Sequence, residues 1–578
     1  MKDAESQPPT ARLDQGTYIG TTLTNSDLPR RVHAFLGVPY AKCVRLSHAE
    51  HLPASSETFD ASEYGPACPT ADPSFPASED CLSANIFRPI PQGSDDVAVK
   101  MLPVLVYVHG GAFNFGRGAD RNLAAFVAFA KTDVIAVSFN YRLGPLGFLP
   151  SGIAQKAGVA NLGLLDQRAL LEWVHRNIIR FGGDAGNVTV MGFSAGAHSL
   201  GHHVLSPPSR KLFRRAILES GAPTARSVLA SKHPRNEAQL ARFLYHASLP
   251  QHLPSDQILS SIRSLSLPKL LEASLAVWSE CAPSVEWPFQ PSIDGDAGEN
   301  TIIPDMPIRT WTSPNLPAPP PLITGFNSSE GTNFVPASAS SSTAFKDFFA
   351  KLIPSLTPDD LETLDRLYPP ASTYPSPPTR HHGTEFRRLA HAYGHYGYIA
   401  PLLHSAHFAS RNGAPVWVYE YAAHADLGAA NHGDHVPAAT HDSDTLSPER
   451  TPGLWAVSDA MHSYWSSFVA SGDETESGPN NQANPSGVAW PRFISPFGEA
   501  PGGSEDHIPR DAEDETRGKI LVFGEGNDEF MGRLGQRRPG TVARVRTLTE
   551  AELRQFRFWW DRVGLSEGMG GADDGSKL

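Results

Sequence analysis

Several short runs of the chain are apolar at almost every position, and polar or glycine-rich stretches separate them. The first two, residues 102–108 (LPVLVYV) and 134–139 (VIAVSF), are typical of central strands of a parallel sheet, which are buried on both faces. Residues 161–180 carry apolar side chains at helical spacing, which predicts a helix. Further apolar runs that indicate strands span residues 188–191, 216–218, 321–325 and 416–421. Strands that alternate with helices predict an α/β protein with a doubly wound sheet.

Proline- and serine-rich stretches interrupt this pattern in the second half of the chain. We expect loops or insertions at residues 336–344 and 368–378, and a polar surface excursion at 471–515. Residues 549–563 are predicted to form a helix, with Thr549 and Glu552 in capping-box spacing. Since no linker separates two units, we expect one domain over residues 17–563, between a flexible N-terminus (1–16) and a disordered tail (564–578).

The composition of the chain argues against several classes of binding partner. The 578 residues include 48 Lys+Arg and 61 Asp+Glu, and this net charge of −13 disfavours nucleic acids and anionic membranes, which are polyanions. No stretch of the sequence approaches the roughly 18 apolar residues that span a bilayer. The four scattered cysteines are too few for a zinc module or a disulfide scaffold. We expect a small-molecule substrate and no cofactor, and the oligomeric state stays open.

A candidate nucleophile lies in the sequence Gly192-Phe193-Ser194-Ala195-Gly196. An apolar strand ends just before this G-x-S-x-G motif and a helix-compatible run follows it, which is the strand–turn–helix context that the motif requires. The glycines allow a sharp turn, because backbone segments approach there too closely for a Cβ. We predict that Ser194 is the nucleophile; the alternative is a Gly/Ser turn without chemical consequence.

Three histidines, His198, His202 and His203, follow this motif closely. A zinc site would need an acidic partner in addition to two histidines four residues apart. We therefore expect packing or surface histidines here, and no metal.

A second glycine motif directly follows the strand at residues 102–108, in the sequence His109-Gly110-Gly111-Ala112-Phe113. Such a turn exposes backbone N–H groups to a substrate oxygen. With the N–H of Ala195, those of Gly110 and Gly111 are predicted to form a three-donor oxyanion hole.

These motifs make the sequence resemble the type-B carboxylesterase family, the cholinesterase-like α/β-hydrolases. The resemblance extends over nearly the whole chain and is most diagnostic from residue 144 to 221. It rests on residues 35–41 (FLGVPYA), 78–82 (SEDCL), 140–144 (NYRLG), 161–168 (NLGLLDQR), 181–184 (FGGD), 192–196 and 219–221 (ESG), and more weakly on 293–295 and 490–493. It implies an α/β-hydrolase fold: a large, mostly parallel central sheet flanked by helices, with long loop insertions.

The resemblance also suggests partners for the nucleophile, because α/β-hydrolases place their triad in the order Ser, acid, His. The family's acid position matches Glu330, which follows the predicted strand at 321–325. Its catalytic histidine matches His432, with His435 as the rival in the same loop. Ser220 is implied to lie beside the triad.

The activity that these residues imply is serine carboxylic-ester hydrolysis through a covalent acyl-enzyme. Phe193 stands where many relatives carry Glu, which favours a small to medium, largely apolar ester. Between Cys68 and Cys81 the loop holds no Trp or Tyr, which disfavours cholinesterase activity. The alternatives are an acyltransferase or cyclase that uses the same acyl-enzyme, and a non-catalytic binding homologue.

The cellular compartment of the protein determines the redox state that we expect for its cysteines. Residues 1–9 are polar, without the apolar core of a signal peptide, and Ser576-Lys577-Leu578 matches a peroxisomal address. We expect an intracellular protein, peroxisomal or otherwise cytoplasmic. The resemblance is compatible with a Cys68–Cys81 bridge, yet a reducing compartment favours free thiols, and we do not predict the bridge.

Overall fold

The structure is a computed structural model of the 578-residue chain. It describes residues 7–25, 27–70, 72, 74–90, 100–225, 228–250, 253–295, 298–316, 318–375, 379, 381–471, 478–480, 484–497 and 516–566. The tail that we expected to be disordered lies outside the described residues from 567 onward, and so does the Ser576-Lys577-Leu578 sequence.

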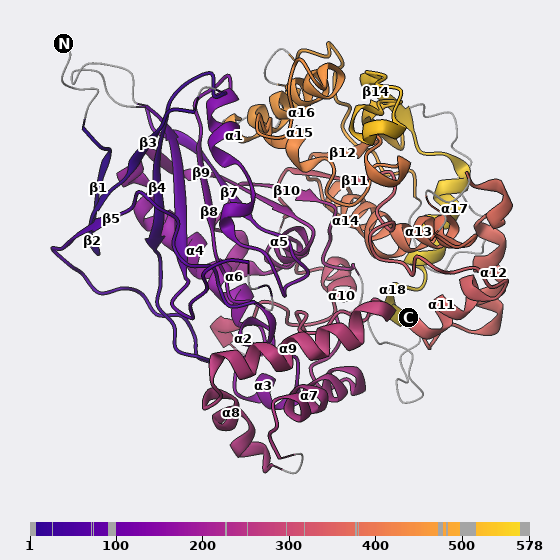
Figure 1. Ribbon diagram of the computed structural model, residues 1–578, viewed down its shortest axis with the longest axis horizontal. Coiled ribbons are helices and arrows are strands. Elements are labelled where there is room, and N and C mark those ends of the chain that lie inside the picture. Colours follow the sequence, from indigo (N-terminus) through magenta and orange to yellow (C-terminus); the bar gives the residue numbers. More distant parts are fainter. Residues whose placement is uncertain are drawn as a thin grey trace.

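A large twisted sheet runs through the molecule, with helices on both of its faces (Figure 1). In the described chain it has eleven strands in the order β14-β13-β12-β11-β10-β9-β7-β8-β6-β4-β3. The seven from β13 to β8 pair in parallel, and antiparallel strands complete both edges. The strands of this sheet are β3 (Thr21–Leu23), β4 (Val32–Pro39), β6 (Ser83–Pro89), β7 (Leu102–Val108), β8 (Ile135–Phe139), β9 (Gly183–Phe193), β10 (Arg215–Glu219), β11 (Leu322–Asn327), β12 (Val416–Tyr421), β13 (Lys519–Glu525) and β14 (Thr541–Thr547). The predicted α/β-hydrolase architecture is confirmed.

The helices cover both faces of the sheet. Successive side chains of β7 point to opposite faces and so belong to two different hydrophobic cores. Val104, Val106 and Val108 belong to the core that contains α4 and α5, whereas Leu105 and Tyr107 belong to the core that contains α1 and α16. The helices are α1 (Leu123–Phe129), α2 (Gly144–Gly147), α3 (Gly152–Lys156), α4 (Leu162–Asn177), α5 (Ala195–Leu205), α6 (Pro207–Arg210), α7 (Pro234–His246), α8 (Ser255–Arg263), α9 (Leu267–Cys281), α10 (Pro307–Thr312), α11 (Ala344–Leu352), α12 (Pro358–Leu367), α13 (Phe386–Gly394), α14 (Ala400–Arg411), α15 (Val436–Thr440), α16 (Pro452–Ala470), α17 (Glu550–Trp560) and α18 (Val563–Ser566). No helix in the described ranges is long and apolar enough to cross a membrane.

The structure differs from two of our expectations, the flexible N-terminus at residues 1–16 and the polar surface excursion at residues 471–515. Residues 10–13, which we placed in a flexible N-terminus, form β1 (Thr10–Leu13) and pair with β2 (Gly16–Ile19), to which β5 (Thr58–Asp60) adds a third strand. The alternating burial of Ala11 and Leu13 explains why this short strand is stable. Within the expected surface excursion, Trp490 is only 1% exposed, and its indole N–H donates to the Val418 carbonyl at 3.0 Å.

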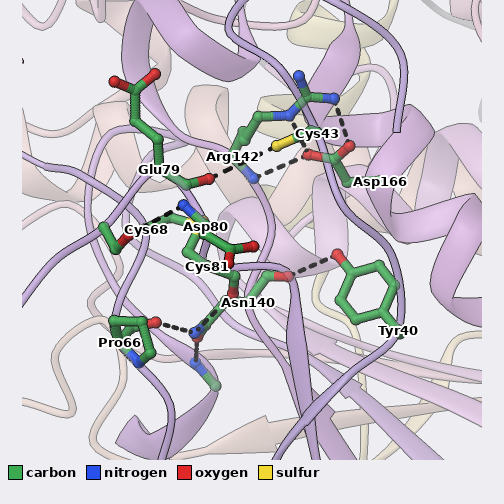
Figure 2. The surroundings of a disulfide bond; sticks show 12 residues. Tyr40, Cys43, Pro66, Cys68, Glu79, Asp80, Cys81, Asn140, Arg142 and Asp166 are labelled. Carbon is green, nitrogen blue, oxygen red and sulfur yellow. Dashed lines mark hydrogen bonds and ion pairs between the residues drawn. A yellow bond between two sulfur atoms is a disulfide. The ribbon is translucent and has the colours of Figure 1, made fainter. Parts of the chain in front are cut away.

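Cys68 and Cys81 form a disulfide bond, which corrects our expectation of free thiols (Figure 2). Their Cα atoms lie 5.0 Å apart, and both residues are buried. Asn140, just beyond β8, donates from Nδ2 to the carbonyls of Pro66 (3.0 Å) and Cys81 (3.3 Å), and its own carbonyl accepts from the Tyr40 hydroxyl at 2.7 Å. The bridged loop is therefore held against the carboxyl end of the central strands.

A buried ion pair holds the carboxyl end of β10. Arg121 donates from Nη1 and Nη2 to the two carboxylate oxygens of Glu219 at 2.5 and 3.2 Å, and both side chains are at most 1% exposed. The Trp465 indole also donates to Glu219 at 2.9 Å, and Arg121 Nε donates to Thr440 Oγ1 at 2.8 Å. Nearly every polar atom of the pair has a partner, which a charge in a low-dielectric interior requires.

We expect the disulfide to stabilise the fold measurably. Closing a loop whose ends are 13 residues apart restricts the unfolded chain and contributes about 3 kcal/mol. The variant with Cys68→Ser and Cys81→Ser should unfold at a lower urea concentration and should no longer respond to reductant. The Cys43→Ser variant, which changes a free cysteine, should keep the wild-type response to reductant. A wild-type urea midpoint that reductant leaves unchanged would contradict the bridge.

The ion pair generates a second stability prediction. Arg121→Met leaves the Glu219 carboxylate buried without its counter-charge and should lower the free energy of unfolding by about 3–5 kcal/mol. Adding Glu219→Gln should recover at least half of this loss, because it removes the uncompensated charge. Arg544→Met is the control, since it breaks an exposed pair with Glu525 and should cost at most about 1 kcal/mol. Equal losses for Arg121→Met and Arg544→Met in urea unfolding would refute the prediction.

Candidate active site

Ser194 occupies a sharp turn between β9 and α5. Its backbone is in a strained conformation with φ 54° and ψ −119°, and its N–H donates to the Glu219 carbonyl at 2.9 Å. The turn needs both glycines of the motif. A Cβ on Gly192 would lie 2.5 Å from the carbonyl carbon of Gly196, and a Cβ on Gly196 would lie 2.1 Å from the Val108 oxygen.

The glycine turn after β7 lies directly against Ser194. A Cβ on Gly110 would lie 3.2 Å from the Ser194 Cβ, and Gly111 has φ 104°, a conformation that favours glycine. Among the turn, loop and cap hydrogen bonds of the described chain, the N–H groups of Gly110, Gly111 and Ala195 donate to no backbone carbonyl. Gly110 and Ala195 therefore lie next to Ser194, Gly111 follows Gly110 in the same turn, and none of the three N–H groups is committed to the backbone.

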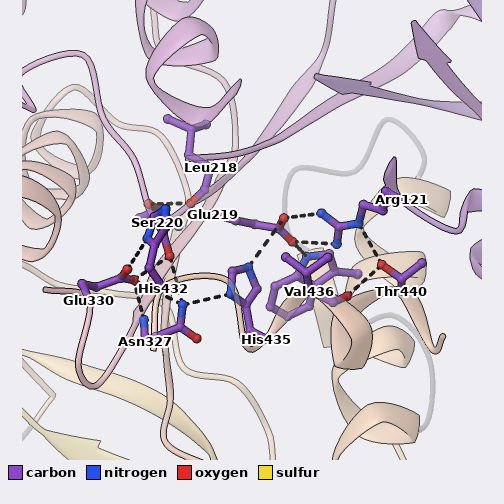
Figure 3. A network of polar contacts seen from close by, with 12 residues as sticks. Arg121, Leu218, Glu219, Ser220, Asn327, Glu330, His432, His435, Val436 and Thr440 are labelled. Atoms are coloured by element: carbon purple, nitrogen blue, oxygen red, sulfur yellow. Dashed lines mark hydrogen bonds and ion pairs between the residues drawn. The ribbon is translucent and has the colours of Figure 1, made fainter. Parts of the chain in front are cut away.

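Glu330 and His432 come from the loops after β11 and β12, and the parallel pairing of these strands brings the loops together. The Nδ1 atom of His432 lies 2.5 Å from Glu330 Oε2, while Glu330 Oε1 accepts from Ser220 Oγ at 2.6 Å and from the Asn327 N–H at 2.7 Å (Figure 3). Glu330 is fully buried, and burial alone would raise its pKa. The neighbouring His432 imidazole and these hydrogen bonds instead hold the pKa of Glu330 below its usual value, so the carboxylate is ionised.

The other nitrogen of His432 is left without a protein partner. His432 Nε2 is buried and makes no hydrogen bond within the described residues. Aromatic rings surround the imidazole: Phe193, Tyr398 and Phe334 have their centroids 4.8, 4.5 and 5.2 Å from it. Since Nδ1 is engaged by Glu330, Nε2 is the atom that can exchange a proton with a reacting group.

The rival histidine, His435, has a different environment. It is fully buried; its Nδ1 lies 3.0 Å from Asn327 Nδ2, and its Nε2 lies 3.7 Å from Glu219 Oε2 (Figure 3). His435 thus connects Asn327, which contacts Glu330, to the buried Arg121–Glu219 pair. Sequence reasoning identified neither Arg121 nor Asn327, because nothing local to either residue marks it as part of this network.

The three histidines on α5 are all buried. His198 pairs with the backbone of Ala222 at 2.9–3.0 Å, and His203 contacts Ser209 Oγ and Gln167 Oε1, each at 3.0 Å. Across the ranges that the structure describes, no group of three or more His, Cys, Asp or Glu side chains could hold a metal ion.

Comparisons with known proteins agree with this architecture. Residues 7–500 match the profile described as "Carboxylesterase family". The chain is 31% identical over 493 residues to "Secreted lipase 4" of Gibberella zeae. This match covers 83% of this chain and 85% of that protein. It is 42% identical over 203 residues to "Para-nitrobenzyl esterase" of Bacillus subtilis, a match that covers 33% of this chain and 40% of that protein.

Solved structures extend the likeness over nearly the whole chain. A structure titled "PNB ESTERASE" has a TM-score of 0.70 at 26% identity and covers 95% of this chain and 100% of its own. The structure of Aspergillus niger EstA has a TM-score of 0.76 at 24% identity, covers 97% of this chain and 100% of its own, and supports the fold alone. With a family profile matched over most of its length, this chain belongs to the carboxylesterase family.

Proposed function

We propose that the protein is a serine carboxylic-ester hydrolase with Ser194, His432 and Glu330 as its catalytic triad. The observation that carries the proposal is the hydrogen bond between Glu330 and His432 Nδ1 at 2.5 Å, in a site where His432 Nε2 lacks a partner. With Nδ1–H donated to the carboxylate, the neutral imidazole has its free lone pair on Nε2. That lone pair accepts the Ser194 proton as the serine attacks an ester carbonyl.

The tetrahedral intermediate carries a negative charge on the former carbonyl oxygen. The N–H groups of Gly110, Gly111 and Ala195 are the proposed donors to that oxygen, and one such donor is typically worth about 3–4 kcal/mol in the transition state. His432 then returns the proton to the leaving alcohol, and Glu330 stabilises the imidazolium that exists between the two transfers. Water activated by the same histidine releases the acid from Ser194.

The site favours a largely apolar substrate. The rings of Phe193, Phe334 and Tyr398 pack around the His432 imidazole, so the surface next to the proposed base is largely aromatic. The names of the relatives, a lipase and a para-nitrobenzyl esterase, point to esters of the same general kind. We propose a small to medium ester with an apolar group next to the carbonyl.

We also propose that the chain folds in an oxidising compartment, in place of the intracellular location expected from its sequence. The buried Cys68–Cys81 disulfide is typical of exported proteins, and the name "Secreted lipase 4" does not fit an intracellular relative. Protein isolated in the presence of a thiol-blocking reagent should carry labels on Cys43 and Cys281 after unfolding, but none on Cys68 or Cys81. Labels on all four cysteines would contradict this proposal.

The triad is tested by the hydrolysis of p-nitrophenyl esters from acetate to palmitate. Ser194→Ala and His432→Ala should lower kcat by about 10⁴- to 10⁶-fold, and Glu330→Gln by about 10⁴-fold, because the histidine loses its orientation and charge stabilisation. His435→Gln is the matched control and should retain at least about a hundredfold more activity than His432→Ala.

Two outcomes would overturn the assignment. Full activity in His432→Ala with loss in His435→Gln would make His435 the base. A wild type that hydrolyses no ester, while an organophosphonate still labels Ser194, would replace hydrolysis by acyl transfer or cyclisation.

A further inference from the structure

Helix α5 extends from the nucleophile into a second polar region of the molecule. Ser194 caps its N-terminus, and His198 and His202 follow at intervals of four residues. Side chains four residues apart lie one above the other on the same helix face. Eight residues of helix advance about 12 Å along the axis, and helical side chains tilt back toward the N-terminus. His202 therefore lies about two helical turns beyond Ser194 along α5, an axial distance of about 12 Å, which is comparable to the length of a medium-chain acyl group.

His202 differs from the neighbouring histidines because it lacks a partner. It is only 3% exposed, yet within the described chain its ring makes no hydrogen bond, whereas the rings of His198 and His203 both do. Burial lowers the pKa of His202 to about 3, so the ring is neutral at physiological pH. A neutral imidazole offers one N–H donor and one lone pair.

The unpartnered ring lines a cavity of about 40 Å³. Asn236, Gln239 and Gln290 also line it, and Asn236 and Gln239 are at most 6% exposed. The amide nitrogens of Asn236 and Gln290 donate to the carbonyls of Ala230 at 3.0 Å and Ala112 at 2.9 Å. Their side-chain oxygens remain as acceptors, so the cavity offers several acceptors and one imidazole to a small polar group.

The cavity adjoins the proposed oxyanion turn. Phe113, the last residue of that turn, lines it together with His198, and their ring centroids are 6.5 Å apart. Its far end shares Leu229, Arg235, Gln239, Leu352 and Tyr396 with a wider cavity of about 390 Å³. The charge of Arg235 is balanced by Glu286, 3.5 Å away. The cavity next to His202 therefore has one residue of the glycine turn in its lining and borders on the wider cavity.

Building on the proposed esterase function, we propose that this cavity is a specificity subsite for the acyl part of the ester. Its ligand is an uncharged hydroxyl group near the far end of a medium-length acyl chain, and His202 is the residue that recognises it. The leaving alcohol takes its proton from His432, so it departs on the β12 side of Ser194. The acyl chain extends away from the leaving group, past Phe113 and His198. The hydroxyl accepts from the imidazole N–H of His202 and donates to an amide oxygen, or it donates to the imidazole lone pair.

The test compares kcat/KM for p-nitrophenyl 8-hydroxyoctanoate and p-nitrophenyl nonanoate, which have the same number of heavy atoms in the acyl chain. The wild type should prefer the hydroxylated ester. His202→Leu should reduce this preference about fivefold or more, which corresponds to the loss of one hydrogen bond, with little change on the nonanoate. His202→Gln, which keeps a donor and an acceptor, should restore part of the preference. His246→Leu, the same change at a histidine of α7 outside the cavity, should leave the preference unchanged.

The other possible results distinguish a failure of the subsite proposal from a failure of the esterase proposal. If the wild type hydrolyses the nonanoate but shows no preference that depends on His202, the subsite is refuted and the esterase proposal stands. A stronger preference for the monoester of octanedioic acid, lost in Arg235→Met, would replace the hydroxyl by a carboxylate and also refute the proposal. If neither ester is hydrolysed by the wild type, the proposed function itself fails.

Discussion

A carboxylate and a guanidinium that are buried together next to the Ser194 turn constrain the rest of the site. Glu219 ends β10, and its backbone oxygen accepts the Ser194 N–H while its side chain pairs with Arg121. Ser220, the next residue, has φ 54° and donates to Glu330. Two strained serines thus flank one ion pair. Because a buried charge tolerates little displacement from its partner, the pair fixes the strand end from which both serines project.

The same region shows how the fold keeps several ionisable groups in a dry interior. Glu330 is ionised because it accepts three short hydrogen bonds, and Asn327 contacts both Glu330 and His435. Glu219, fully buried as well, is ionised because Arg121 lies against it. Each carboxylate has its own set of donors, and Asn327 and His435 lie between the two sets. The side chains of Asn327 and His435 therefore separate the two carboxylates.

Sequence reasoning predicted the central strands well because burial on both faces leaves an unbroken apolar run. Leu102–Val108 and Val416–Tyr421 begin and end where the hydrophobic pattern places them. The N-terminal strand Thr10–Leu13 was missed because it is short and its polar residues face outward. The helix over residues 549–563 was predicted nearly to its ends, with the capping box of Thr549 and Glu552 present, because a cap is a local signal.

The site was predictable where it is local in sequence and not where it depends on long-range contacts. The two glycine motifs identified Ser194, Gly110 and Gly111 as neighbours of strand ends, and the loop after β12 left His432 and His435 as alternatives. Only the three-dimensional arrangement shows that Glu330 contacts the first and Asn327 the second. Arg121 was missed because its partner lies 98 residues away, and no local pattern identifies such a pair.

The order of the strands also bears on when the protein becomes active as it is made. Ser194, Glu330 and His432 follow β9, β11 and β12, so the chain must leave the ribosome as far as residue 432 before the proposed triad can assemble. Until β12 pairs with β11, the loop that carries His432 is not held next to the strained serine turn. With the proposed triad, an incomplete chain lacks its base, so the producing cell would not be exposed to an active hydrolase during translation.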